Sequence, residues 1–414
     1  MQILVLTNEY PPNVYGGAGV HVHHLTEELL RLKNKKIGLE ILCFGDQKES
    51  GPNKRLLGME SPPDTPFRSL HYKKLLDPLY RNLIMTGSTE KAELVHCHTW
   101  YTYLAGCLIK QIIGIPMIIT AHSLEPLRPW KKEQLGDAYY ATSWLEKTAL
   151  ENADAVIAVS ESMKSDLVSI YQIDPDKVDV IYNGIDTERF KKIEKPEVLH
   201  KYGIDPQKPY VLFVGRITVQ KGIIHLVEAI ARLKKETQVV LCAGAPDTDE
   251  IGRQMRQKVD EAKKLFGGNI VWITECVSEK DLVPLYSHAS IFVCPSVYEP
   301  FGIINLEAMA CETPVVASAT GGIKEIVKNG ETGILVPFEP FENSNGGPKD
   351  PEKFSKDLAD AINSLLQSPE RIQKMAFASR QRVEQIFSWK SIAGQTFEFY
   401  RKIIEAHRKK RRLT

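Results

Sequence analysis

The chain has 414 residues, of which 25% are charged and 43% are hydrophobic, and its net charge is +1. The length predicts two domains, and the near-neutral charge excludes a global electrostatic attraction to nucleic acid or to an anionic membrane. Seven scattered cysteines without a C-x-x-C pair, no charged leader before an apolar stretch and no run that could span a bilayer predict a reduced, cytoplasmic protein without a membrane span.

The opening of the chain predicts a strand, a glycine-rich loop and a helix. Residues 2–7 are apolar, and the segment NVYGGAGVHVHHLTEELLRL that follows combines glycines with a helical apolar period. The glycines lack the G-x-G-x-x-G spacing and Glu40 lies inside a predicted strand, which argues against a dinucleotide site. The glycine pair either brings backbone close to a ligand or only forms a tight turn. Further strands are predicted near residues 38–44, 93–96, 116–120, 155–159 and 178–181.

The same pattern restarts near residue 210. The segment KPYVLFVGRITVQKGIIHLVEAIARLKK predicts a strand, a loop and an amphipathic helix. Further strands are predicted near residues 238–243, 270–273, 290–294, 313–317 and 333–336. Runs such as QVVLCAG and TPVVAS are almost continuously apolar, which suits parallel strands covered on both faces. The sequence therefore predicts an α/β fold of two doubly wound parallel sheets, as two Rossmann-like domains that face each other across a deep cleft.

The domain boundaries are expected in polar segments. The stretch over residues 189–209 is polar and should contain the joint between the two halves. We expect an N-terminal domain over residues 1–192, a C-terminal domain over residues 193–382, and helices over residues 383–414 that return to the N-terminal domain. The chain ends in the basic tail HRKKRRLT, for which solvated charges are the simpler interpretation and a function stays open.

Two cations follow the first strand of the second half. Arg216 and Lys221 are expected at the carboxyl edge of a parallel sheet, where open α/β sheets bind ligands. There they could neutralise a diphosphate leaving group, or they could be two exposed cations on a loop.

The segment SVYEPFGIINLEAMA places Glu299 and Glu307 eight residues apart around the start of an apolar helix. Burying an ionised carboxylate without a partner is costly. The helix N-terminus offers free backbone N–H groups, and Gly302 lets a ligand approach them. Ribose hydroxyls could donate to Glu307 and sugar hydroxyls to Glu299. The expected partner of both acids is therefore a polyhydroxylated ligand and not a protein cation.

Histidines follow two strands of the first half. His122 is either a structural group or a reacting one, and His96, His98 and Trp100 either line an acceptor groove or form a wet strand end. His21, His23 and His24 could suggest a metal site, but His23 and His24 are adjacent and face different ways on a helix, and no D-x-D-like motif ends a strand. No metal site is predicted.

Taken together, these motifs resemble the retaining GT-B glycosyltransferases of family 4. The E-P-F-G segment with its second Glu resembles the donor-site motif, GRITVQKG resembles the phosphate loop, and AVSESMKSDL, VIYNGIDTERF and SATGGIKEIV fit the same pattern. The similarity covers about residues 2–400. The segment AHSLEPLRPWKKEQLGDAYYATSWLEKTALENADAVIAVS resembles the glycogen synthase branch that uses ADP-glucose, some members of which make maltose 1-phosphate. The resemblance implies the GT-B fold, with the acceptor on the N-terminal domain and the donor on the C-terminal domain.

The resemblance also implies roles for individual residues. Arg216 and Lys221 would stabilise the leaving diphosphate, and Glu307 would bind the ribose. Glu299 would hold hydroxyls of the transferred glucose, and His122 would lie at the reacting centre. The other residues implied at the donor are Gly17, Asn183, Val277, Phe301, Gly302 and Ile303, with Thr320, Gly321 and Gly322 at the wall of the same pocket.

Two positions depart from the larger starch-synthase relatives. Tyr15 stands where those relatives carry a Lys, and Thr99 stands where they carry an Asp. The acceptor-side residues here would be His98 and Trp100. The departures put the acceptor in question and leave the donor prediction as it is.

The sequence therefore predicts a glycogen synthase that transfers glucose from ADP-glucose or UDP-glucose to an α-1,4-glucan end with retention of configuration. The alternative is maltose 1-phosphate synthesis from ADP-glucose and glucose 1-phosphate. More remote alternatives are another family 4 hexosyltransferase, a sugar-nucleotide epimerase and a sugar-nucleotide sensor without catalysis. No cofactor or metal is expected, and the oligomeric state stays open.

Overall fold

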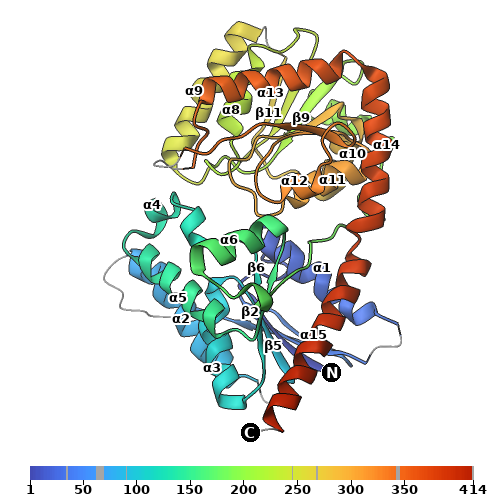
Figure 1. Ribbon diagram of the computed structural model, residues 1–414. Coiled ribbons are helices and arrows are strands. Elements are labelled where there is room, and N and C mark those ends of the chain that lie inside the picture. The colour runs from blue at the N-terminus through green and yellow to red at the C-terminus, as the bar shows by residue number, and fades with distance from the viewer. Residues whose placement is uncertain are drawn as a thin grey trace. The chain divides into compact units, whose positions relative to one another are not determined.

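The computed structural model describes residues 1–33, 36–61, 70–89, 91–244, 246–266, 269–341 and 346–412. The chain forms two compact units. Unit 1 contains Met1–Gly184 and Trp389–Thr414, and unit 2 contains Ile185–Ser388 (Figure 1). These boundaries differ by a few residues from the predicted ones after residues 192 and 382. Among the described residues, no helix combines the length and the apolar character needed to cross a membrane.

Unit 1 is built on an eight-stranded sheet with the order β3-β4-β2-β1-β5-β6-β7-β8. Its strands are β1 Gln2–Leu6, β2 Gly38–Phe44, β3 Lys48–Ser50, β4 Lys54–Met59, β5 Leu94–His98, β6 Met117–Ala121, β7 Ala155–Ala158 and β8 Val178–Val180. All neighbouring strands are parallel except β3, which is antiparallel to β4. Every residue of β6 and β7 is buried, as expected for parallel strands with helices on both faces.

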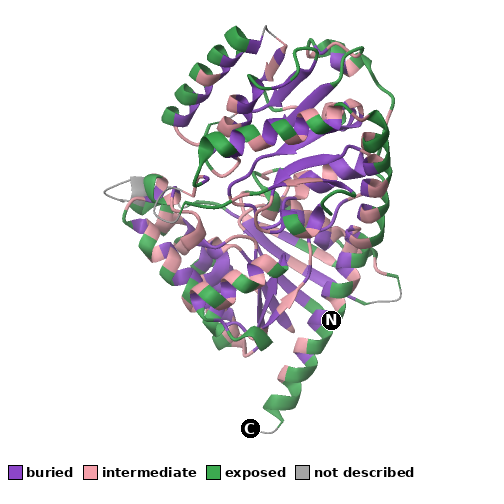
Figure 2. Cartoon of the chain, turned by 45° about the horizontal axis from the view of Figure 1, so that its top comes forward, coloured by how far each residue is buried: buried purple, intermediate pink, exposed green. Residues whose placement is uncertain are grey.

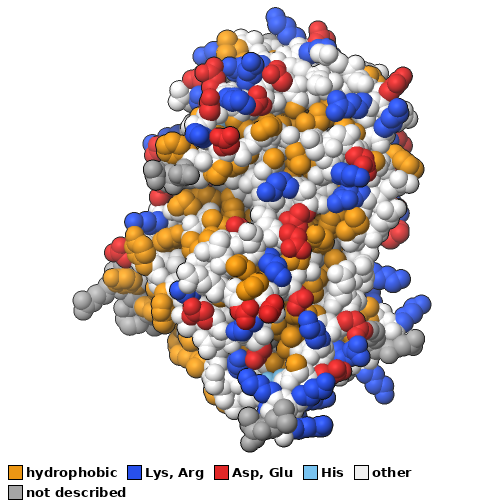
Figure 3. All heavy atoms as spheres, in the orientation of Figure 1, with side chains coloured by type: hydrophobic (Ala, Val, Ile, Leu, Met, Phe, Trp, Pro, Cys, Tyr) orange, Lys and Arg blue, Asp and Glu red, His pale blue; other side chains and the backbone are white. Residues whose placement is uncertain are grey.

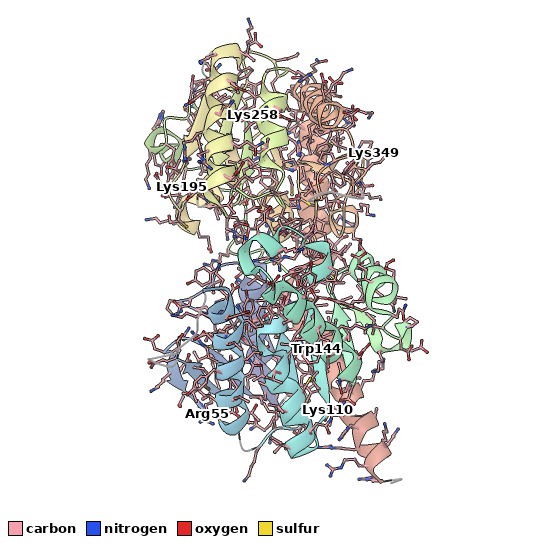
Figure 4. All side chains as sticks on the ribbon, turned by 90° about the vertical axis from the view of Figure 1, so that its left-hand side faces the viewer. Arg55, Lys110, Trp144, Lys195, Lys258 and Lys349 are labelled. Atoms are coloured by element: carbon pink, nitrogen blue, oxygen red, sulfur yellow. The ribbon has the colours of Figure 1, made fainter. Side chains whose placement is uncertain are left out.

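The helices of unit 1 connect these strands and cover the sheet. They are α1 Gly17–Arg31, α2 Leu70–Gly87, η1 Trp100–Thr102, α3 Tyr103–Ile113, η2 Glu125–Leu127, α4 Lys131–Leu135, α5 Ala138–Asn152, α6 Glu161–Tyr171, η3 Pro175–Lys177 and α15 Trp389–Arg411. Their inner faces are buried and their outer faces exposed (Figure 2). On α5, for example, Leu145 and Ala149 are buried, whereas Trp144 is 66% exposed on the face that Figure 4 turns toward the reader.

Unit 2 has a six-stranded, entirely parallel sheet with the order β11-β10-β9-β12-β13-β14. Its strands are β9 Tyr210–Val214, β10 Gln238–Cys242, β11 Ile270–Ile273, β12 Ile291–Cys294, β13 Val315–Ser318 and β14 Gly333–Val336. Its helices are α7 Glu197–Lys201, α8 Ile223–Ile230, α9 Asp249–Phe266, α10 Glu279–His288, α11 Ile303–Ala310, α12 Ile323–Ile326, α13 Pro351–Leu366 and α14 Pro369–Ile386. One apolar core joins the sheet to α8, α9 and α13.

The C-terminal helix α15 completes unit 1. Trp389 is 3% exposed and packs against Gly184, where a Cβ would lie 2.6 Å from the indole ring. The hydroxyl of Tyr400 lies 2.7 Å from Nδ1 of His96 on β5. Near its end, Arg411 donates to the carbonyl of Gly114 at 3.2 Å. Lys and Arg side chains gather around this end in Figure 3.

The predicted fold class is confirmed as two doubly wound parallel sheets. Each of the predicted strands is present within a few residues. The sequence missed the β3–β4 hairpin, because β3 is short, charged and fully exposed at the edge of the sheet. Such edge strands carry no apolar pattern.

Candidate active site

Each sheet has one switch point, where the crossovers leave in opposite directions. It lies between β1 and β5 in unit 1 and between β9 and β12 in unit 2. Ligands of open α/β sheets bind outside the carboxyl ends of the strands at such a point. In unit 1, Gly17 comes after β1 and His98 is the last residue of β5. In unit 2, Arg216 and Lys221 follow β9, and Glu299 follows β12. The topology therefore places the predicted residues at the two ligand-binding edges.

In unit 2, Glu299 and Lys221 form a buried ion pair. Lys221 Nζ donates to Oε2 of Glu299 at 2.7 Å, and Ser296 Oγ donates to the same oxygen at 3.2 Å. Glu299 is only 7% exposed. Burial acts to lower the pKa of Lys221, but the Glu299 carboxylate overcomes this effect and the pKa is raised. Lys221 is therefore protonated at neutral pH.

This pair corrects one prediction. The sequence suggested that the partner of Glu299 is a ligand and not a protein cation, yet the structure pairs it with Lys221, 78 residues away along the chain. The two residues meet because β9 and β12 are neighbours in the sheet. A buried carboxylate needs such compensation when no ligand is bound.

Arg216 lies on the same loop as Lys221 and is more accessible. Its Nη1 donates to Asp247 Oδ1 at 2.6 Å, and 55% of its side chain is exposed. The loop itself is tightened by Thr218, whose Oγ1 accepts from the Lys221 backbone N–H at 3.1 Å. The guanidinium is thus held in place by one acid while much of it stays open to an anion.

Glu307 differs from Glu299 because its partner in the protein is neutral. The Tyr286 hydroxyl on α10 donates to Glu307 Oε2 at 2.9 Å. Burial raises the pKa of Glu307 to about 7 in spite of this bond. The pKa of this carboxyl therefore lies near neutral pH, and hydroxyl groups that donate to it would favour its ionised form.

The backbone around Glu299 depends on glycine. Gly302 has a φ of 106°, and a Cβ there would lie 2.6 Å from Nδ2 of Asn305. Gly321 has a φ of 48°, and its Cβ would lie 2.0 Å from the carbonyl oxygen of Glu299. The Gly322 N–H donates to the same oxygen at 3.0 Å. The segment from Thr320 to Gly322 therefore packs directly on the Glu299 loop.

Three predicted donor residues are placed by their side chains. Phe301 is 2% exposed, and its ring centroid lies 6.0 Å from that of Phe387, so its side chain is a packing group. Ile303 begins α11 and Val277 follows β11, and both are half-buried. Only the backbone of Phe301 remains for a ligand, whereas the side chains of the other two are partly open.

In unit 1, His122 is bonded to His98. The Nδ1 atom of His98 and the Nε2 atom of His122 lie 2.9 Å apart. His98 is fully buried, and burial lowers the pKa of both imidazoles well below the usual range. Both rings are therefore neutral at physiological pH. Because one ring must donate and the other accept, His98 sets the tautomer and orientation of His122.

His98 and Trp100 do not line an open groove. Their exposed fractions are 0% and 4%, and the Trp100 ring stacks on Tyr101 at 4.1 Å between centroids. The wet strand end that was the alternative is also wrong, because His96 is buried as well and its Nε2 lies 2.7 Å from Thr120 Oγ1. Acceptor contacts by the side chains of His98 and Trp100 would need a different conformation.

Asn183 contacts His21, which the sequence suggested only as a possible metal ligand. Its Oδ1 lies 2.7 Å from Nδ1 of His21, and its side chain is 5% exposed. The His21 ring centroid lies 4.8 Å from that of His122, and burial lowers the pKa of His21 to about 4. Asn183 therefore supports the histidine cluster and does not present its amide to solvent.

Gly17 begins α1 and is exposed, as a contact to a ligand requires. The loop before it is held by Glu9, whose Oε2 accepts from the backbone N–H groups of Tyr15 at 2.8 Å and Gly16 at 2.9 Å. Tyr15 itself is 83% exposed. The sequence did not indicate this role of Glu9, since it depends on the path of the loop.

One group of side chains in the described part of the chain could hold a metal ion. It consists of His21, His98 and His122, whose ligand atoms lie within 4.8 Å of one another. Nε2 of His21 and Nε2 of His98 are buried and have no hydrogen-bond partner among the described residues. Neutral imidazoles are common metal ligands. The sequence-based expectation that no metal is required stays a prediction.

Two doubly wound parallel sheets in series form the architecture of the GT-B glycosyltransferases, and the comparisons with known proteins place the chain in this class. The family described as "Glycosyltransferase Family 4" matches residues 15–189, and the family "Glycosyl transferases group 1" matches residues 194–382. A relative from Mycolicibacterium smegmatis named "Alpha-maltose-1-phosphate synthase" is 44% identical over 97% of this chain and 100% of its own length. The chain belongs to glycosyltransferase family 4, and it is a hexosyltransferase.

Two further similarities are more distant. A glycogen synthase from Mycobacterium tuberculosis is 28% identical over 97% of this chain and 94% of its own length. The solved structure of a sucrose-phosphate synthase from Thermosynechococcus elongatus superposes with a TM-score of 0.78 and 26% identity, covering 98% of this chain and all of that one. Because the enzyme is a hexosyltransferase, the epimerase and the non-catalytic sensor are not retained as alternatives.

Proposed function

We propose that the enzyme makes maltose 1-phosphate by transferring glucose from a nucleotide sugar, with ADP-glucose favoured, to glucose 1-phosphate. The observation that carries the proposal is the full-length similarity at 44% identity to the maltose-1-phosphate synthase, against 28% for the glycogen synthase. It favours the alternative of the sequence analysis over its main prediction. Thr99, which replaces the Asp of the larger relatives, is consistent with a different acceptor.

The donor would be held by the residues of unit 2. Arg216 and Lys221 would neutralise the diphosphate as it leaves, and each already has an acidic partner that holds its side chain in place. Glu307 would accept from ribose hydroxyls, and Glu299 from hydroxyls of the transferred glucose. The backbone of Phe301 and Gly302, with Ile303 beside it, would contact the donor, and Val277 would lie against the base.

The transferred glucose and the acceptor would meet the residues of unit 1. His122, neutral and oriented by His98, would contact the glucose at the reacting centre, with Gly17 near the diphosphate. The nearby acids are already engaged, since Glu9 accepts from two amides and Glu125 is paired with Arg128. Neither is free to act as a covalent nucleophile. We therefore favour front-face attack with retention, in which the leaving diphosphate accepts the proton of the attacking hydroxyl.

The deciding experiment measures nucleoside diphosphate release and the products from ADP-glucose, with glucose 1-phosphate and glycogen as separate acceptors. UDP-glucose serves as the donor control, and a Glu299→Gln variant as the inactive control. We expect release with glucose 1-phosphate, accompanied by maltose 1-phosphate. Nucleoside diphosphate release only with glycogen, together with chain growth, would indicate a glycogen synthase and overturn the proposal.

A further inference from the structure

An acceptor that carries a phosphate needs positive charge near the reacting centre, and unit 1 offers little of it there. The loops that follow β1, β5 and β6 cover residues 7–16, 99–102 and 122–130. Within these three loops, Arg128 is the only Lys or Arg. Tyr15 stands where the larger relatives have a Lys, so the glycine-rich loop supplies no charge either.

The guanidinium of Arg128 lies close to His122. Its Nη1 donates to Oγ of Ser123, the residue after His122, at 3.2 Å and to Oε1 of Glu125 at 3.2 Å. Both bonds use the same nitrogen, so Nε and Nη2 carry no hydrogen bond to the described residues. The side chain is 20% exposed, which leaves it anchored but accessible.

Glu125, the acid that bonds to Arg128, is also bonded through its backbone to a second buried acid, Glu146. Glu125 and Glu146 are 1% and 3% exposed, and Oε2 of Glu146 accepts from the Glu125 backbone N–H at 2.8 Å and from the Tyr171 hydroxyl at 2.6 Å. Burial, together with the charge of Glu125, raises the pKa of Glu146 to about 8. Of these two acids, Arg128 bonds to Glu125.

Arg128 also lies near the end of β5. Burial raises the pKa of the Tyr101 hydroxyl. The charges of Glu125, Arg128 and Glu9 have smaller effects on the same pKa. Charges on the loops after β6 and β1 therefore act on the ring that stacks on Trp100. Arg128 lies in the loop that follows the carboxyl end of β6, and the carboxyl ends of parallel strands form the ligand-binding edge of such a sheet.

We propose that Arg128 binds the phosphate group of the glucose 1-phosphate acceptor through Nε and Nη2. The inference rests on the proposed function and names the residue that would separate a phosphorylated acceptor from a neutral glucan end. A planar guanidinium suits two parallel bonds to phosphate oxygens, which a lysine cannot make. The bond to Glu125 fixes the guanidinium beforehand, so little side-chain freedom is lost when the phosphate binds.

The test uses the full-length enzyme with Arg128→Gln and Arg128→Lys. Lys132→Gln is the matched control, because Lys132 is an exposed cation of the neighbouring helix α4 and bonds to Tyr140 at 2.7 Å. For each variant, the KM for glucose 1-phosphate, the KM for ADP-glucose, the rate of ADP-glucose hydrolysis without acceptor and the inhibition by inorganic phosphate are measured.

In Arg128→Gln, the KM for glucose 1-phosphate should rise about 10- to 100-fold, the range for a lost hydrogen bond to a charged group. Competitive inhibition by inorganic phosphate should weaken in parallel, while donor KM and donor hydrolysis stay unchanged. Arg128→Lys should fall between, and Lys132→Gln should match the unchanged enzyme. An unaltered KM for glucose 1-phosphate in Arg128→Gln would overturn the role of Arg128 alone. If the unchanged enzyme forms no maltose 1-phosphate, the proposed function and this site both fall.

Discussion

The carboxyl edges of the two sheets carry different kinds of polar side chains at their centres. In unit 2, the edge carries fixed charges in pairs, Lys221 with Glu299 and Arg216 with Asp247. In unit 1, the centre of the edge is a cluster of neutral imidazoles that includes His98 and His122. The same kind of fold therefore presents ion pairs at the centre of one edge and neutral imidazoles at the centre of the other.

This difference matches what each edge would have to bind. A diphosphate leaving group develops negative charge, and preorganised cations stabilise it most effectively where water is excluded. A transferred glucose is neutral, and a neutral imidazole can contact its hydroxyls without competing for the phosphate charge. Variants of Lys221 and of His98 test whether one edge depends on charge and the other on the orientation of a side chain.

The largest effect is expected from Lys221→Met. The change removes a cation at the diphosphate and leaves Glu299 buried without a charge partner. We expect kcat to fall about 1,000-fold and the free energy of unfolding to fall by about 3 kcal/mol. Steady-state kinetics and denaturant unfolding measure the two losses separately.

The double variant Lys221→Met/Glu299→Gln separates those losses. With both charges removed, most of the lost stability should return, while kcat should stay low. Recovery of activity together with stability would mean that Lys221 serves only to neutralise Glu299. The ionic character of the unit 2 edge would then have no catalytic purpose.

A smaller effect is expected when the imidazole cluster is disturbed. His98→Asn removes the ring that orients His122 but leaves His122 itself. We expect kcat to fall roughly 100-fold or less, the scale for misplacing a group at a reacting centre. The KM for the donor should change little, since the cations proposed to hold the diphosphate, Arg216 and Lys221, lie in unit 2.

His122→Asn provides the comparison for this prediction. If orientation is the role of His98, the double variant His98→Asn/His122→Asn should be no worse than His122→Asn alone. Additive losses would show that His98 contributes independently of His122.

The fold was predictable because many of its strands are almost continuous apolar runs in the sequence. The runs that became β6, β10 and β13 are buried on both faces, so tertiary contacts reinforced the local pattern. The β3–β4 hairpin had no such pattern, since β3 is a charged edge strand. The doubly wound parallel arrangement also followed, because strand–helix repetition implies parallel crossovers of one hand. The strand order itself was not predicted.

The site was predictable where one short segment contains it and not where distant segments meet. Glu299, Gly302 and Glu307 share a single motif, whereas the partner of Glu299 comes from another loop. The bonds from His98 to His122 and from His21 to Asn183 join different strands and loops, and no local pattern encodes them. The burial of Trp100 depended in the same way on the packing around η1.

Glu307 yields a prediction about protons. Its pKa is about 7 in the free enzyme, and ribose hydroxyls would favour the ionised carboxylate. ADP binding should therefore lower this pKa and release protons near pH 7, and ADP affinity should fall as the pH drops below 7. Calorimetry in buffers of different ionisation enthalpy measures the protons released.

Glu307→Gln is the control for that measurement. It should abolish the proton release and weaken ADP binding by about tenfold or less. The variant should also unfold less readily at pH 8. The folded pKa lies above the usual value of 4.5, so the stability that comes from protonation is lost as the pH rises through 7. Proton release that persists in Glu307→Gln would assign the titration to another group.

The smallest effect is expected from removing metal ions. If charge at the reacting centre comes only from Lys221, Arg216 and Arg128, treatment with EDTA should change kcat by less than about twofold. His21, His98 and His122 could nevertheless hold an ion, since two of their nitrogens lack partners. A large loss of activity with EDTA that Zn²⁺ restores, and that is absent in a His21→Asn variant, would put a positive charge at the imidazole cluster of unit 1. The contrast between the two centres would then be false, because the cluster would also act by charge.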